Sequence, residues 1–137
     1  MDVSRLTRYF EDTPDLGVAS AYLFGSQAEG RAHRESDVDV AVLLDRKRYP
    51  TDRDRFEARV RLTSDLISVL NANEIDLVIL NDAPPLFGRR IVYEGKKLFL
   101  GDPEEDLAFT RDVQLQAADI APWLERMRRI KLEALAR

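Results

Sequence analysis

The stretch from Gly25 to Leu44, GSQAEGRAHRESDVDVAVLL, is the part of the chain that best predicts its fold. Within it, Asp37 and Asp39 open an otherwise apolar run that continues to Leu44. Successive side chains of a strand point to opposite faces, so the two aspartates would share one face and the valines between and after them the other. The pattern therefore predicts a strand over residues Asp37–Leu44.

A third aspartate lies where this residue type is rare. Asp76 falls inside EIDLVIL (Glu74–Leu80), which the pattern predicts as another strand. Aspartate is depleted in strands, and an unpaired buried carboxylate is costly. If the two strands are neighbours, Asp76 joins Asp37 and Asp39 in a cluster that needs a cation. Alternatively, these acids cap strand ends or pair with arginines.

The residue types favour Mg²⁺ as that cation. Carboxylate oxygens are hard ligands, and Mg²⁺ in proteins is typically bound by few carboxylates together with substrate phosphates. The chain has no cysteine and one histidine, which argues against zinc. The absence of cysteine also excludes disulfide scaffolds and a cysteine nucleophile.

Gly25 and Ser26 follow the apolar segment Ala19–Phe24, which is predicted to be a strand, and precede a polar stretch. A glycine lets the backbone approach a phosphate closely, and free N–H groups at a helix start point at an anion. Arg31 and Ser36 lie in the same connection, where an arginine could bind phosphate oxygens. A common turn and ordinary loop charge are the simpler interpretations of these residues taken singly.

The remaining periodicity predicts an α/β fold in which a small mixed sheet of about four strands is flanked by helices. In the second helix a stripe of apolar residues is expected to be buried, and Pro122 is expected to kink or divide the last helix. Helices are predicted at Val3–Glu11, from the N-cap Thr51 to Asn71, at Pro84–Tyr93 and at about 103–137, with a fourth, edge strand at Lys96–Leu100; the stripe comprises Phe56, Val60, Thr63, Ile67 and Leu70.

Size and composition fit one globular domain over residues 1–137, with a C-terminal helical segment at about 103–137. Of the 137 residues, 45% are hydrophobic and 34% are charged, which excludes a disordered chain. The net charge of −4 argues against nucleic acid as a direct ligand. The N-terminus does not resemble a signal peptide, and no apolar run is long enough for a membrane span, so a cytoplasmic location is expected.

Gly25-Ser26, ten residues, then Asp37-Val38-Asp39 resembles the signature of the DNA polymerase β-like nucleotidyltransferase superfamily. The whole stretch is similar to its minimal nucleotidyltransferase (MNT) members. The resemblance implies the polymerase β-like fold, with Asp37 and Asp39 holding two Mg²⁺ ions. Asp76 would share one ion and accept the proton of the attacking hydroxyl. Gly25 and Ser26 would bind the β- and γ-phosphates of ATP, with Arg31 and Ser36 as further candidates for nucleotide binding.

The same resemblance implies a partner. MNT proteins are commonly the antitoxins of HEPN/MNT toxin–antitoxin pairs, and members adenylylate a tyrosine of a helical HEPN ribonuclease toxin. We therefore expect a Mg²⁺-dependent enzyme that moves AMP from ATP to a hydroxyl of such a toxin and forms a hetero-oligomer with it. Apolar groups beyond those that one small sheet needs either contact the partner or simply cover the sheet: Tyr93, Phe99, Phe109, Trp123 and those of the last helix.

Three other functions remain open at this point. The chain could neutralise a toxin by binding and occlusion with little catalysis. It could be a small-molecule nucleotidyltransferase of the aminoglycoside-modifying type, although such enzymes usually carry a further substrate-binding domain. A nucleic-acid polymerase fits the acidic charge balance least well.

Overall fold

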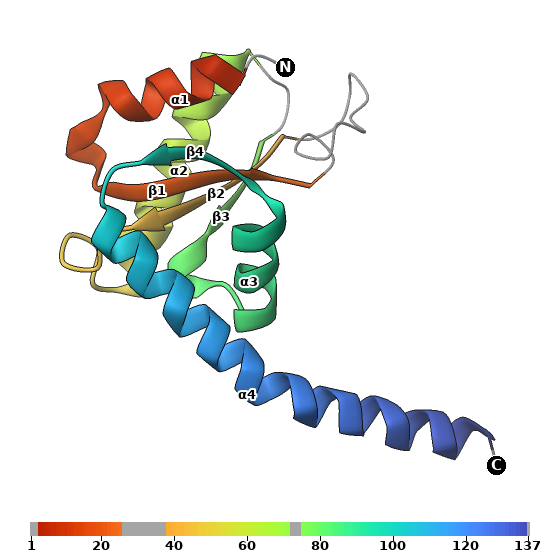
Figure 1. Ribbon diagram of the computed structural model, residues 1–137. Helices are drawn as coiled ribbons and strands as arrows, with labels where there is room; N and C mark the ends of the chain where they lie inside the picture. Colours follow the sequence, from red (N-terminus) through yellow and green to blue (C-terminus); the bar gives the residue numbers. More distant parts are fainter. Residues whose placement is uncertain (1–2, 26–37, 72–74, 137) are drawn as a thin grey trace.

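The described helices and strands follow the predicted order, and the short helical stretch expected at Gln27–Arg34 lies outside the described residues (Figure 1). The structure, a computed structural model, describes residues 3–25, 38–71 and 75–136. Its elements are α1 (Val3–Asp12), the 3-10 turn η1 (Pro14–Leu16), β1 (Val18–Phe24), β2 (Val38–Leu44), α2 (Asp52–Leu70), β3 (Ile75–Ile79), the 3-10 turn η2 (Leu80–Asp82), α3 (Pro85–Glu94), β4 (Lys96–Leu100) and α4 (Pro103–Ala136).

The strands of the described residues form one mixed sheet in the order β3-β2-β1-β4. β1 runs antiparallel to both β2 and β4, whereas β2 and β3 run parallel. The predicted small mixed sheet is confirmed, as are the edge position of Lys96–Leu100 and the pairing of the Asp76 strand with the Asp39 strand. β3 forms the other edge, which the sequence did not indicate.

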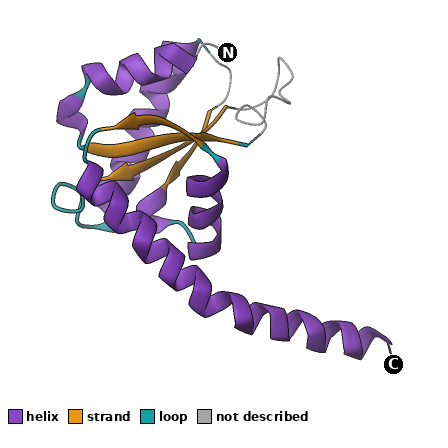
Figure 2. Ribbon diagram, viewed as in Figure 1, coloured by secondary structure: helices purple, strands orange, loops and turns teal. Residues whose placement is uncertain are grey.

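Helices cover both faces of the sheet (Figure 2). α1 and α2 pack on one face and α3 and α4 on the other, and each face has its own apolar core. β2 supplies both cores, because its alternate residues point to opposite sides. Val38, Val40, Val42 and Leu44 point to the α1/α2 face, and Ala41 and Leu43 to the α3/α4 face.

The buried face of α2 differs from the predicted one. Its N-cap is Thr51 as expected, with the Thr51 side chain accepting a hydrogen bond from the Asp54 N–H at 3.1 Å. However, the stripe that packs on the sheet is Ala58, Leu62 and Leu66. Phe56 is 62% exposed and Val60 56% exposed, so the predicted stripe was largely wrong. Both sets have helical spacing, and periodicity alone does not say which one faces the sheet.

The last helix is not divided at Pro122. α4 runs unbroken from Pro103 to Ala136 and changes direction along its length (Figure 1). Ala117 is its last buried residue, and the C-terminal half extends away from the sheet. That half lies free of neighbouring backbone, so the helix can bend to accommodate a proline where a packed helix would break.

The four aromatic residues considered as partner contacts divide into two pairs. Phe109 belongs to the core on the α3/α4 face, and Phe99 packs against the other core and stacks on Phe10. These two cover the sheet. Tyr93 and Trp123 are exposed. No helix of the described ranges is long and apolar enough to cross a membrane.

A buried polar cluster fixes the start of α4 to the sheet. The Tyr22 hydroxyl donates to Asp106 Oδ1 at 2.6 Å, and Lys97 Nζ donates to Asp106 Oδ2 at 2.8 Å. Burial, the largest single influence, would raise the pKa of Asp106, but the hydrogen bonds that the carboxylate accepts and the positive charge of Lys97 together outweigh it and hold the pKa below its usual value. The charged form of Asp106 therefore joins β1, β4 and α4.

We predict that Asp106→Asn lowers the free energy of unfolding at pH 7 by about 1–3 kcal/mol, because Lys97 loses its anionic partner. The folded pKa of Asp106 lies below the unfolded value, so this stabilisation is present above about pH 4 and is lost as the pH falls through the folded pKa. Urea denaturation at pH 7, 5 and 3 measures it. Asp112→Asn, which affects only an exposed pair with Arg46, is the control. Equal losses for the two variants at pH 7 would contradict the prediction.

Candidate active site

The end of one strand and the starts of two others lie close together at one end of the sheet. β1 is antiparallel to β2, and β2 is parallel to β3, so the end of β1 lies beside the starts of β2 and β3. In this register Phe24 is the partner of Asp39, and Asp39 is the partner of Asp76. Gly25 follows Phe24 directly. The topology thus brings Gly25, Asp39 and Asp76 together, as the sequence predicts.

Asp39 and Asp76 project from the same face of the sheet. Val38 and Val40, on either side of Asp39, are buried in the core on the α1/α2 face, and so is Leu77 beside Asp76. Both aspartates therefore point to the α3/α4 face, on strands whose backbones lie about 4.8 Å apart. Asp39 is half-buried and Asp76 is exposed. Two like charges directly opposite each other are destabilising unless a cation lies between or beside them.

Gly25 is constrained in two ways. Its φ of +73° lies in the left-handed region, where side chains are rarely found. A Cβ atom built on it would lie 2.3 Å from Asp39 Oδ2 and 3.1 Å from Asp39 Cγ. The carboxylate therefore occupies the space that any larger residue would need. Only glycine lets the chain turn here while Asp39 remains in place.

Four predicted site residues lie outside the described residues: Ser26, Arg31, Ser36 and Asp37. Their roles stay predictions. At this end of the sheet, the described residues of the candidate site are Gly25, Asp39 and Asp76. These residues fit a magnesium site, because their carboxylate oxygens are hard ligands in adjacent register, one of them open to solvent. The absence of a side chain at Gly25 lets the backbone lie directly against the Asp39 carboxylate.

The sequence did not reveal what surrounds these residues. The Phe24 ring packs edge-to-face on Phe87 of α3, with their centroids 5.8 Å apart, so α3 lies next to the end of β1. An open groove of about 640 Å³ runs along Leu77–Ile79 of β3, directly after Asp76. Its walls come from α2, from α3 and from the connection before α3. Since residues of two helices, a strand and a connection build it, no local sequence pattern predicts it.

Comparison with known proteins agrees with the predicted chemistry. The family model described as polymerase beta, nucleotidyltransferase matches residues 5–104. The protein adenylyltransferase MntA of Shewanella oneidensis is 33% identical over 94 residues, which are 69% of this chain and 63% of that protein. The chain thus matches less than two thirds of that relative. The protein adenylyltransferase MntA of Aphanizomenon flos-aquae is 28% identical over 114 residues, 81% of this chain and 73% of that protein.

Solved structures share the fold over the full length of the chain. One is a crystal structure of a toxin–antitoxin complex with AMP-PNP, in which a chain 27% identical to this one superposes with a TM-score of 0.68. The match covers 100% of both chains. Another, of a mutant MntA–HpeT toxin–antitoxin complex, has a TM-score of 0.68 at 25% identity. The polymerase β-like fold expected from the sequence is therefore confirmed.

We predict that Gly25→Ala weakens Mg²⁺-dependent binding of ATP at least about tenfold, because the new methyl group displaces the Asp39 carboxylate. Isothermal titration calorimetry measures the affinity. Gly17→Ala is the matched control: Gly17 also has a positive φ, of 69°, but its neighbours are Arg48 and Tyr49. Both variants should lose similar stability from backbone strain. Loss of ATP binding by both, or by neither, would count against the proposed geometry.

Proposed function

This chain belongs to the polymerase beta nucleotidyltransferase family, and from that premise we propose that it is a Mg²⁺-dependent protein adenylyltransferase acting as an antitoxin. Residues 1–137 form its nucleotidyltransferase domain. It moves AMP from ATP to a hydroxyl, that of a tyrosine, on a HEPN-type toxin with which it forms a hetero-oligomer. ATP as donor implies the cytoplasm. The observation that carries the proposal is the register of Asp39 with Asp76 beside Gly25, in a chain similar to MntA adenylyltransferases.

The residues have distinct roles in this proposal. Asp37, Asp39 and Asp76 would hold two Mg²⁺ ions, which when bound neutralise phosphate charge and help orient the reacting oxygens. Gly25 and Ser26 would bind the β- and γ-phosphates, since a glycine allows an anion to approach the backbone closely. Additional phosphate contacts are assigned to Arg31 and Ser36.

Of the described carboxylates, Asp76 is the one suited to contact the acceptor hydroxyl. It is exposed and lies on an edge strand, whereas Asp39 is half-buried between two strands. The acceptor oxygen forms a bond to the α-phosphorus as the bond from that phosphorus to the bridging oxygen breaks, and pyrophosphate leaves in line. The hydroxyl proton passes to the Asp76 carboxylate. The protein contributes mainly positioning and preorganised charge.

The C-terminal half of α4 offers a surface for the partner. Beyond Ala117 no residue up to Ala136 is buried, and this half extends away from the sheet (Figure 1). Isolated helices of this length are marginal in water, so a partner would stabilise it. Its apolar residues recur at helical spacing and are flanked by basic ones, which suits packing against a helical protein: Ile120, Trp123, Leu124, Met127 and Ile130.

Neutralisation by occlusion is a second candidate function, and this exposed half of α4 is the observation that favours it. The surface lies apart from the carboxylates, so binding does not need catalysis. The small-molecule alternative gains no comparable support, since the groove next to Asp76 is open and not an enclosed ligand cavity.

We predict that Asp76→Asn reduces transfer of label from α-³²P-ATP to the co-expressed HEPN-type toxin by about 100-fold or more. The change removes one of two opposed charges, so the metal-free free energy of unfolding should stay equal or rise by up to about 1 kcal/mol. Label transfer and urea denaturation measure the two effects. A variant that labels the toxin normally would overturn the assignment of Asp76. A variant that loses labelling but still neutralises the toxin at equal abundance would favour occlusion.

We also predict that Met127→Glu weakens binding of the toxin by at least about tenfold without changing ATP affinity. The charge would fall within the apolar stripe of α4, where a packed interface tolerates it poorly. Leu115→Glu is the control, because Leu115 is also exposed on the same helix, at 67% against 46% for Met127, but lies away from the stripe. Surface plasmon resonance of the two variants compares them. Equal affinities would place the toxin elsewhere on the chain.

A further inference from the structure

The two edges of the sheet are not alike. β4 carries Lys96 and Lys97, and the Thr7 hydroxyl of α1 donates to the Leu98 carbonyl at 3.0 Å. Lysines and covering contacts are how proteins normally protect an edge. β3 has the sequence IDLVI and pairs with β2 alone among the strands of the described part. Its outer side thus presents backbone N–H and C=O groups of a strand without lysine or proline.

A groove follows this open edge. It has a volume of about 640 Å³, and Leu77, Val78 and Ile79 form its floor. Leu77 and Ile79 point to the α1/α2 face and Val78 to the α3/α4 face, so the groove includes both sides of the edge. Phe56 of α2 and Phe87 of α3 stand on its opposite walls, and each has more than a third of its surface exposed.

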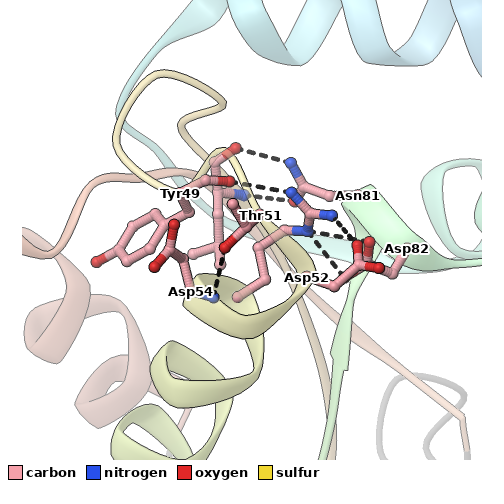
Figure 3. A network of polar contacts seen from close by, with 8 residues as sticks. Tyr49, Thr51, Asp52, Asp54, Asn81 and Asp82 are labelled. Atoms are coloured by element: carbon pink, nitrogen blue, oxygen red, sulfur yellow. Dashed lines mark hydrogen bonds and ion pairs between the residues drawn. The ribbon is translucent and has the colours of Figure 1, made fainter.

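The walls of this groove are held in place by a polar network (Figure 3). Arg55 Nε donates to both Asp82 carboxylate oxygens at 3.0 Å, and Arg55 Nη1 donates to the Tyr49 carbonyl at 3.0 Å. Arg55 Nη2 also donates a hydrogen bond to Asp52 Oδ1. Asn81 exchanges two hydrogen bonds of 2.9 Å with the backbone of Leu44. Together these bonds join the start of α2 to the segment after β3, so the groove is preformed.

The groove is continuous with the candidate active site. Its floor begins at Leu77, one strand residue or about 3.3 Å beyond Asp76. A residue added opposite Asp76 on a neighbouring strand would have its Cβ about 5 Å from that of Asp76. A hydroxyl-bearing side chain at this position would lie on the same face as the Asp76 carboxylate, as transfer requires.

We propose that the acceptor segment of the toxin binds in an extended conformation as an added strand along the outer edge of β3, with its hydroxyl-bearing residue opposite Asp76. This inference rests on the proposed function. Backbone hydrogen bonds would give affinity, and the two aromatic walls would receive alternate apolar side chains. Arg59 lines the groove and has no carboxylate partner within the described ranges, so an acidic residue on the α2 side would complement it.

The first test compares two variants of α2. Phe56→Glu places a charge on the groove wall, whereas Val60→Glu places it on an exposed residue of the same helix that does not line the groove. The KM for the co-expressed toxin in label transfer should rise about tenfold or more in F56E and stay unchanged in V60E. ATP affinity and the thermal unfolding midpoint should be the same in both variants.

The second test measures backbone protection directly. Amide hydrogen exchange of residues 75–79 is followed in the full chain alone and with the toxin, Mg²⁺ and α,β-methylene ATP, which binds without releasing pyrophosphate. An added strand should slow exchange in this segment at least about tenfold when the toxin is present. Unchanged exchange in residues 75–79 would overturn the inference. So would protection that appears without toxin and grows with chain concentration, because a second copy would then occupy the edge.

The two proposals fail in different ways. If the unaltered chain does not label the toxin, the proposed function is overturned and this inference with it. If the unaltered chain labels the toxin while F56E and V60E have equal KM values, only the added-strand inference is overturned.

Discussion

The rest of the structure depends on two carboxylates placed side by side at one end of the sheet. Asp39 and Asp76 are partners in register on neighbouring parallel strands, and their repulsion opposes the pairing of those strands. The opposite face of the same strands supplies the stabilisation. Val38, Val40 and Leu77 are buried there against α1 and α2. Strand alternation thus separates a stabilising face from a reactive one, and this separation allows a small sheet to hold charges together.

The same alternation explains why this strand and its two faces could be predicted from the sequence. The period-two pattern around Asp39 predicted the strand and its two faces, and the structure confirms both for Val38–Leu44 and places Asp39 as expected, whereas Asp37 lies outside the described residues. Gly25 was predicted for the approach of phosphate, and the structure adds a reason that the sequence could not contain: the Asp39 carboxylate occupies the space of its missing side chain. That contact joins residues far apart in the sequence, so only the fold reveals it.

Other features could not be predicted because the local sequence pattern is compatible with more than one structure. α2 has two apolar stripes with helical spacing, and the stripe that contains Leu62 is the buried one. Tertiary contacts such as the hydrogen bonds from Arg55 to Asp82 accompany this orientation of the helix. Pro122 was expected to kink or divide α4; the helix is not divided but changes direction along its length, and its packing against the rest of the protein ends at Ala117. The groove beside β3 is assembled from β3, α2, α3 and the connection before α3. Sequence periodicity reflects the neighbours of a residue within one helix or strand. The buried face of α2, the course of α4 and the groove depend on contacts between elements, which periodicity does not contain.

An open strand edge is a liability, because it offers unpaired backbone groups to any other chain. The β4 edge has lysines and a contact from α1 against this hazard, so the fold has the means to protect an edge. β3 has no lysine and, within residues 3–25, 38–71 and 75–136, receives no such side-chain hydrogen bond, and it is the strand that carries Asp76. An edge with apolar walls held by the Arg55 network, next to the residue that receives the acceptor, is suited to pair with a partner. The difference between the two edges therefore follows from the position of the reactive face, and it makes the acceptor part of the sheet during transfer.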